Sequence, residues 1–453
     1  MTRPKQVGFR NHPTYTVAEL FCGCGGFSRG FELARRFRVV FGNDVKEFAL
    51  RTFEFNHTHD GTAPVVLRQD IRTVPDGDIA RLLESKGVSS LDCLIGGPPC
   101  QGFSQMRRSE ARRGSKIVGF GGYNKLDQDA RNDLVLRFLE VVAALKPKVV
   151  VIENVPQFLS HFHDGKRGGI AQQVEEVLQE LGYQVACGIL NAADFGVPQL
   201  RLRAVIIASR LGAIALPVPT HGEPDELSGW KGKPWVTVRE AIEDLPPDPP
   251  LHEPLGNSEA SQFVKPAGNP FTKQMRRSGS FPLNHVTRRY KPRILEIIAQ
   301  MRPGETWDEA SERMRKRFAV LIEKAVTKGE SEAQARRRLE AEGTIQRVFY
   351  KRYYWSAYTR LDWSRPALTI TANANFLGSG RFTHPELNRG ITMREAARLQ
   401  SFDDAFTFVT SASEKRLTEN IGVGMDMIGE AVPPLLAKAL ADTIAVHLDK
   451  HRR

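Results

Sequence analysis

The first half of the chain alternates between short apolar segments and longer amphipathic ones. Seven runs of seven or eight residues are apolar through most of their length: YTVAELF, RVVFGND, PVVLRQD, LDCLIGG, KVVVIEN, YQVACGIL and RAVIIAS. Segments with helical periodicity, such as residues 131–145 and 170–181, lie between them. Apolar runs separated by helices predict a mostly parallel, doubly wound α/β sheet with helices on both faces. In such sheets ligands bind beyond the carboxyl ends of the strands, so the residues after each run are the candidates for function.

The pattern changes after about residue 215. Nine prolines between residues 217 and 254 exclude a long regular element there and mark the entry to a second domain. Residues 305–342 combine helical periodicity with a modest apolar stripe, which predicts a helical insertion. Two further helical segments, residues 393–402 and 431–448, follow it. We expect one domain of residues 1–215 to which residues 388–453 return, and a smaller domain of residues 216–387 inserted between them.

Charge distinguishes the two predicted domains. The 453-residue chain has a net charge of +12, and residues 271–360 hold 21 Lys and Arg against 10 Asp and Glu. The aromatic and basic segment FYKRYYWSAYTR, residues 349–360, lies in this region. A basic domain with interleaved aromatic residues is typical of a surface that binds nucleic acid, although a solvated helical face would give the same counts.

The cysteines and the apolar segments bear on location. The five cysteines, at positions 22, 24, 93, 100 and 187, include no doubled C-x-x-C spacing, so we expect no metal site and a reducing cytoplasm. The sequence shows no apolar leader and no apolar run of about 18 residues, so we expect no membrane contact.

The first apolar run ends in a glycine-rich turn, LFCGCGGFSRGF, residues 20–31. Gly23, Gly25 and Gly26 allow a tight turn and a close approach of ligand to backbone before a helix N-terminus. Ser28 stands where a dinucleotide fingerprint has its third glycine, which disfavours a nicotinamide oxidoreductase.

Aspartates follow the second and third runs. Asp44 lies nineteen residues after Gly25, near the spacing at which a carboxylate binds ribose hydroxyls, and Asp70 follows the third run. Together they favour a nucleoside-bearing cofactor without phosphates, although either aspartate alone could be a helix cap.

The fourth run breaks at Pro98-Pro99 and leads directly into Cys100. A cysteine at a strand end near helix N-termini can ionise and act as a nucleophile, although an isolated cysteine is more often buried and inert. Glu153, at the end of the fifth run, could protonate or hydrogen-bond a substrate. The glycine- and arginine-rich segment after Cys100 is typical of a loop that closes on a large anionic substrate.

Three polar residues alternate at the start of the last run. Gln199, Arg201 and Arg203 should share one face, which could hold a polar substrate or an active-site loop.

Taken in order, nine segments of the chain resemble the DNA (cytosine-5) methyltransferase family: LFCGCGGFSRGF, GND, QDI, GGPPCQGFS, ENV, NAADFGVPQLRLR, RPALTIT, ITMREAARLQSF and IGEAVPPLLAKALA. The resemblance implies a Rossmann-like methyltransferase domain with residues 216–387 as the target-recognition domain. It also implies transfer of a methyl group from S-adenosyl-L-methionine to carbon 5 of a cytosine flipped out of double-stranded DNA.

The resemblance assigns roles to individual residues. Cys100 would attack carbon 6 of the cytosine, and Glu153 would hydrogen-bond and protonate ring nitrogen 3. Arg203 would contact the base, while Asn154 and Arg201 would support the site. The residues expected to bind the cofactor are Phe21, Gly23, Gly25, Gly26, Asp44, Val45, Asp70, Ile71, Pro98 and Val432. Those expected to contact DNA are Gln101, Ser104, Arg107, Arg108 and Gln199.

The chain departs from the family pattern at Glu430, where the last block usually has Asn, and in a longer segment after Cys100. We expect a cytoplasmic, nucleoid-associated bacterial enzyme that acts as a monomer on DNA. It would belong to a restriction-modification system, with a cognate endonuclease acting separately, or be a solitary methylase. The alternatives are a tRNA cytosine-5 methyltransferase and a DNA-binding regulator with impaired catalysis. No target sequence follows from residues 216–387.

Overall fold

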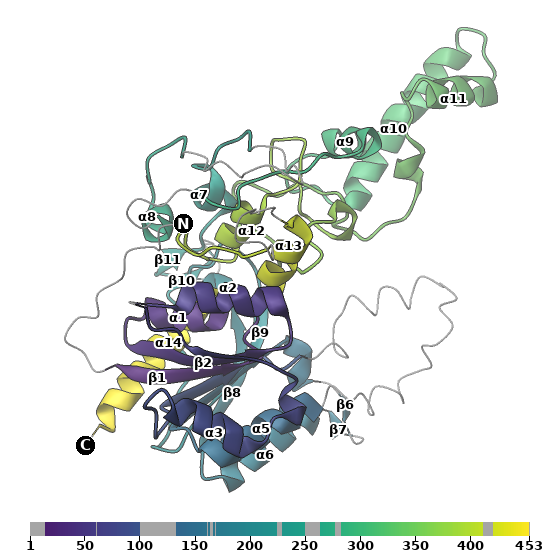
Figure 1. Ribbon diagram of the computed structural model, residues 1–453. Helices are drawn as coiled ribbons and strands as arrows, with labels where there is room; N and C mark the ends of the chain where they lie inside the picture. The colour runs from purple at the N-terminus through teal and green to yellow at the C-terminus, as the bar shows by residue number, and fades with distance from the viewer. Residues whose placement is uncertain are drawn as a thin grey trace.

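The computed structural model describes residues 14–59, 61–99, 133–160, 162–163, 166–167, 169–223, 229–249, 263–276, 282–410 and 420–452. A seven-stranded sheet forms the centre of one part of the molecule (Figure 1). Its strands, in spatial order, are β3 (Val65–Arg68), β2 (Phe37–Asp44), β1 (Tyr15–Leu20), β4 (Cys93–Gly96), β5 (Val149–Asn154), β9 (Leu202–Ser209) and β8 (Gln184–Asn191). In this sheet β9 runs opposite to the other six strands, which are parallel to one another. The predicted fold class and all seven predicted strands are confirmed.

Helices cover both faces of the sheet (Figure 1). One layer contains α1 (Gly26–Leu33), α2 (Glu47–His57) and α14 (Pro434–Lys450), and the other contains α3 (Asp76–Glu84), α5 (Asp133–Leu145) and α6 (Gly169–Glu180). The strands alternate between the two layers: in β1, Val17 packs with the first core, and Ala18 and Leu20 pack with the second. The chain reverses its direction of winding between β1 and β4, and at such a switch point the carboxyl ends of the strands leave a crevice.

The remaining helices lie beyond one end of the sheet (Figure 1). They are α7 (Val238–Ile242), α8 (Pro270–Met275), α9 (Pro292–Ala299), α12 (Met393–Leu399) and α13 (Ile421–Glu430). Farther out, α10 (Trp307–Val326) and α11 (Glu332–Ala341) form a projecting hairpin, so residues 305–342 are helical as predicted, and their being an insertion stays a prediction. Short elements complete the fold: η1 (Ile71–Thr73), η4 (Pro156–Leu159), η5 (Ala192–Phe195), η6 (Arg347–Tyr350), η7 (Leu377–Ser379), and the strand pairs β6 (Phe162–His163) with β7 (Lys166–Arg167) and β10 (His221–Gly222) with β11 (Lys233–Pro234).

The C-terminal helix packs against the first helix of the chain. α14 packs along α1, and the two helices approach closely because Gly30 has no side chain. A Cβ atom at Gly30 would lie 2.3 Å from the Cβ of Ala437. By contrast, α12 packs against α7 and α13. The division into domains stays a prediction, and these contacts favour a return to the sheet at α14 rather than at residue 388.

One apolar stretch, Ile421–Lys450, could cross a membrane by length and composition alone. It is divided between α13 and α14, and 72% of its most apolar window is buried inside the molecule. Packing in the core therefore accounts for its apolar character.

Candidate active site

The glycine turn after β1 is built from left-handed backbone conformations. Gly23 and Gly25 have φ angles of 51° and 93°, and Phe21, with a φ of 56°, shares this conformation. A Cβ atom at Gly25 would lie 2.4 Å from Nε2 of His57, so glycine is required there. A Cβ atom at Gly23 would meet no other atom within 4 Å, which leaves room for a ligand over the turn.

Two distant segments close around this turn. The backbone N–H of Gly23 donates to Oδ2 of Asp44 at 2.9 Å, so the aspartate at the end of β2 fixes the turn after β1. A Cβ atom at Gly26 would lie 2.5 Å from the carbonyl oxygen of Val432, which brings the start of α1 against the segment before α14. Val45, next to Asp44, is exposed.

Asp70 acts as a cap on η1. Its carboxylate accepts from the backbone N–H of Arg72 at 3.0 Å and pairs with the Arg72 guanidinium, which lowers the pKa of Asp70. Ile71 is buried. The capping role that the sequence left open for Asp70 is thus present, and cofactor binding by Asp70 and Ile71 stays a prediction.

Glu153 and Arg203 meet at the carboxyl end of β5. Nε of Arg203 lies 2.7 Å from Oε1 of Glu153, and both side chains are nearly buried. Burial lowers the pKa of Arg203, and the carboxylate of Glu153 opposes this shift. A Cβ atom at Gly97 would lie 3.3 Å from Oε2 of Glu153, so this carboxyl group borders the segment that leads to Cys100.

Asn154 holds the same segment from the other side. Its Nδ2 donates to the carbonyl oxygen of Pro98 at 3.1 Å, and its Oδ1 accepts from the backbone N–H of Val155 at 2.8 Å. Pro98 is buried under this contact. The residues predicted to follow it, Cys100, Gln101, Ser104, Arg107 and Arg108, lie outside the described residues.

Arg201 is a buried link between the sheet and the C-terminal segment. Its guanidinium donates to the carbonyl oxygens of Ile370 at 2.8 Å, Gly429 at 2.9 Å and Ala431 at 3.1 Å. Burial lowers the pKa of Arg201, and the nearby Arg203 adds to this shift. The contacts fit a supporting residue better than one that touches a substrate.

The prediction that Gln199 contacts DNA does not fit the structure. Gln199 is fully buried: its Oε1 accepts from the backbone N–H of Ile370 at 2.8 Å, and its Nε2 donates to the carbonyl oxygen of Leu399 at 3.2 Å. The alternation of polar residues predicted a shared face correctly, but the segment around Ala367 pairs with residue 199 and covers that face. No local pattern in the sequence indicates this cover.

Two acidic residues near the site, Glu19 and Glu430, make contacts that the sequence did not predict. Glu19 in β1 is buried and accepts from both the backbone N–H and the hydroxyl of Ser28, and burial raises its pKa to about 8. The position of Glu19 inside an otherwise apolar run was the one feature of the sequence that could have indicated its burial. Glu430, which departs from the family pattern, pairs with Lys46 at 2.5 Å and so joins the end of α13 to the segment that follows β2.

The four described cysteines do not have the properties of a nucleophile. Cys22, Cys24 and Cys93 are fully buried, and burial raises the pKa of each thiol. The pKa of Cys187 is raised to about 11 by partial burial and by Glu175. Among the described residues, no group of three or more His, Cys, Asp or Glu could hold a metal ion.

The fold and the site define an α/β enzyme with a ligand turn at the switch point and an acid–arginine pair beside it. The family model for C-5 cytosine-specific DNA methylases matches residues 15–445, and the chain belongs to this family.

The similarity to known proteins extends over nearly the whole chain. Type II methyltransferase M.DdeI of Desulfomicrobium norvegicum is 30% identical over 96% of this chain and 89% of its own length. Type II methyltransferase M.XorII of Xanthomonas oryzae pv. oryzae is 32% identical over 95% of this chain and 85% of its own. A crystal structure of a putative DNA modification methyltransferase encoded within an E. coli prophage superposes with a TM-score of 0.63. At 21% identity over 96% of this chain and all of that one, it shows the shared fold.

Proposed function

We propose that this chain methylates carbon 5 of cytosine within a specific sequence of double-stranded DNA, with S-adenosyl-L-methionine as the methyl donor. It would act in the bacterial cytoplasm on nucleoid DNA, as a monomer, either beside a separate restriction endonuclease or as a solitary methylase. Similarity to two type II methyltransferases over most of the chain supports the modification role.

The observation that carries the proposal is the Glu153–Arg203 pair beside Gly97. An acid held at 2.7 Å by a fixed guanidinium is oriented before a substrate arrives. With a cytosine flipped into this crevice, Glu153 would hydrogen-bond ring nitrogen 3 and Arg203 would hold the carboxyl group and contact the base.

Cys100 would supply the nucleophile. Its thiolate would add to carbon 6 of the cytosine, while protonation of nitrogen 3 by Glu153 keeps negative charge from building up on the ring. Carbon 5 then carries the electron density needed to accept a methyl group. Transfer of the carbon 5 proton to solvent, departure of the Cys100 thiolate and return of the nitrogen 3 proton to Glu153 would restore the aromatic ring and free the enzyme.

The residues around the glycine turn fit the methyl donor. The open space at Gly23, the carboxylate of Asp44 and the exposed Val45 would hold its nucleoside part, with Phe21, Asp70, Ile71, Pro98 and Val432 nearby in the sequence blocks. When bound, the sulfonium group of the donor would supply an electrophilic methyl group.

The test is bisulfite sequencing of DNA from a host without cytosine methylation. Expression of the natural chain should methylate one recurrent motif, and Cys100→Ala should abolish this methylation. Cys187→Ala is the matched control, because Cys187 is exposed and lies on the edge strand β8, so it should leave methylation unchanged. A Cys100→Ala variant with full activity would overturn the mechanism.

The nearest alternative is methylation of tRNA. The two type II relatives favour duplex DNA. A competition between plasmid DNA and tRNA, with methyl transfer to each measured, separates the alternatives, and preferential labelling of tRNA would contradict the proposal. A regulator without catalysis would leave both substrates unlabelled.

A further inference from the structure

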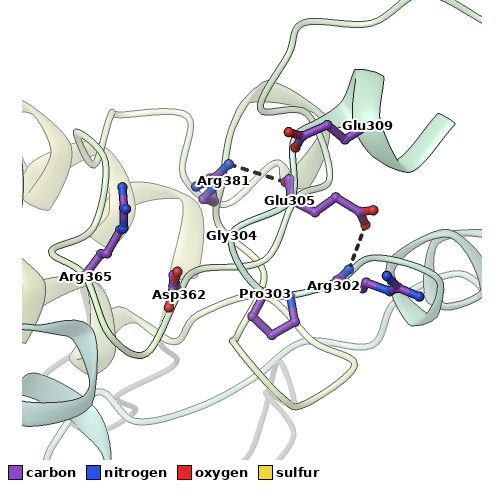
Figure 2. Close-up of a pocket in the computed structure, with 8 residues that line it drawn as sticks. All are labelled: Arg302, Pro303, Gly304, Glu305, Glu309, Asp362, Arg365 and Arg381. Carbon is purple, nitrogen blue, oxygen red and sulfur yellow. Dashed lines mark hydrogen bonds between the residues drawn. The ribbon is translucent and has the colours of Figure 1, made fainter. Parts of the chain in front are cut away.

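An open polar pocket of about 450 Å³ lies where the start of the α10–α11 hairpin meets two later loops (Figure 2). Its volume lies in the range of ligand pockets, but its lining is mostly charged instead of apolar. The residues that line it are Arg302, Pro303, Gly304, Glu305, Glu309, Asp362, Arg365 and Arg381.

Two of its three acids are already engaged. Both carboxylate oxygens of Glu305 pair with the guanidinium of Arg313 at 2.7 Å. Glu309 completes the capping box of α10 by accepting from the backbone N–H and the hydroxyl of Thr306, each at 2.8 Å. Both oxygens of Glu305 are therefore occupied, whereas Glu309 is exposed and uses only its Oε2 in the hydrogen bonds found among the described residues.

Asp362 is partly buried in the pocket, unlike the exposed Glu309. Its Oδ1 accepts from the backbone N–H of Ser364 at 2.9 Å and from the Ser364 hydroxyl at 2.8 Å, which fixes the carboxylate. Its Oδ2 accepts no hydrogen bond from the described part of the chain. Gly304 has a left-handed φ of 73°, and a Cβ atom there would lie 2.9 Å from this oxygen. The absence of a side chain at Gly304 therefore lets Oδ2 lie close against this turn, where it lines the pocket as an oriented acceptor.

Arg381, which also lines the pocket, provides an oriented donor (Figure 2). Its Nε donates to Oγ1 of Thr359 at 3.2 Å, and its Nη2 donates to the carbonyl oxygen of Glu305 at 3.3 Å. The guanidinium also lies over the ring of Trp355, 5.6 Å from the ring centroid. These contacts use one edge of the guanidinium and leave the end that carries Nη1 available.

The pocket is connected to the active site through the backbone. Arg365 lies two residues before Ala367, which pairs with Gln199, and Gln199 lies four residues before Arg203. This path is at most about 25 Å long. Along a duplex, that length corresponds to about seven base pairs.

We propose that this pocket reads one G·C base pair of the target duplex from the major groove. Oδ2 of Asp362 would accept from the amino group of cytosine, and the free end of Arg381 would donate to O6 and N7 of guanine. In the major groove a G·C pair presents two adjacent acceptors, N7 and O6, followed by the donor, whereas an A·T pair places its donor between its two acceptors. A planar guanidinium that donates to two adjacent acceptors, beside one fixed acceptor, therefore matches G·C. The inference rests on the proposed function, since it names a specificity determinant for it.

The test is methylation of a randomised duplex library by purified protein, read by bisulfite sequencing. Asp362→Asn and Arg381→Lys should each relax the preference for G·C at the same single position of the motif, by on the order of 5- to 150-fold. Arg381→Lys keeps the charge but loses the planar fork. Arg317→Ala is the control, because this exposed arginine of α10 does not line the pocket, and it should leave the motif unchanged. Cofactor binding and the thermal midpoint of each variant report on folding.

The outcomes separate this inference from the proposed function. If the natural chain methylates one motif and the variants keep that motif, the inference is overturned alone. It is also overturned if Asp362→Asn and Arg381→Lys slow methylation equally on all sequences, because that pattern indicates contact with a phosphate. Absence of any methylation by the natural chain would overturn both.

Discussion

Single residues at the end of β5 set the expected chemistry. Glu153→Gln keeps the size of the side chain but removes its acid, so transfer should slow by on the order of 10²- to 10⁴-fold. Strand β4, which leads to Gly97, lies between the glycine turn after β1 and the Glu153–Arg203 ion pair on β5 and β9. The affinity for the cofactor should therefore stay within a few-fold of that of the natural chain. Single-turnover methylation and calorimetric titration with S-adenosyl-L-methionine measure the two quantities. If the Glu153→Gln variant transfers methyl groups at the natural rate, Glu153 has no part in the mechanism.

A second residue, Glu19 in β1, should make the stability of the protein depend on pH. Burial raises the pKa of Glu19 to about 8 from an ordinary value of 4.5, so the folded state keeps a proton that the unfolded state releases. Stability should therefore fall as pH rises from about 4.5 to about 8, and remain at the lower level above that range. Glu19→Gln removes this titration, and at pH 8 it should be the more stable protein by roughly 1–3 kcal/mol. Urea unfolding at pH 5, 6, 7 and 8 tests this, and a difference between the two proteins that does not change with pH would contradict it.

The residue types indicated which side chains carry chemical groups of the site better than they indicated what surrounds each side chain. Glu153 and Arg203 were both expected at the site, and they meet because β5 and β9 are neighbours. Gln199 was expected on a DNA-facing surface, but Ile370 and Leu399, far away in the sequence, bind its amide. Burial by a distant segment depends on tertiary packing, which one sequence does not reveal.

Among the elements, α1 and α14 make the contact most sensitive to a single atom. Gly30→Ala would place a methyl group 2.3 Å from the Cβ of Ala437 and 2.5 Å from the carbonyl oxygen of Pro434, so the helices must separate. We expect a loss of roughly 1–3 kcal/mol in the free energy of unfolding. Gly77→Ala in α3 is the control, because no atom lies within 4 Å of its Cβ position, and it should be neutral or slightly stabilising. Denaturant unfolding of both variants measures this, and equal midpoints would show that α14 adjusts freely.

The elements differ in how well the sequence predicted them. The strands were predictable because a buried parallel sheet needs apolar residues on both faces of each strand. Helix α13 was not predicted: Gly422, Gly424 and Gly429 lower its helix propensity, and packing explains it instead. A Cβ atom at Gly424 would lie 2.1 Å from Cε of Met393 in α12, so the glycine permits a close helix contact.

For the whole molecule, the placement of charge matters more than its total. Residues 307–342, which span the α10–α11 hairpin, hold nine Lys and Arg against eight Asp and Glu, and ion pairs such as Arg338 with Glu330 use many of them. Residues 271–306 and 343–360 together hold twelve Lys and Arg against two Asp and Glu. Most of this positive charge therefore lies in the segments directly before and after the hairpin, although the hairpin itself extends farthest from the sheet (Figure 1).

This distribution predicts which cations govern DNA affinity. Alanine at Arg289, Lys291 and Arg293, all exposed before and at the start of α9, should weaken binding to any duplex. It should also reduce the slope of log affinity against log salt by about 0.9 for each phosphate that is no longer neutralised. The matched control replaces three exposed arginines of the hairpin, Arg315, Arg317 and Arg337, and removes the same formal charge. Binding measured from low to high salt should then be nearly unchanged, because the DNA would lie near the base of the hairpin and screening weakens charges more than about 10 Å away. Equal reductions of slope in the two triple variants would instead mean that the hairpin lies along the duplex.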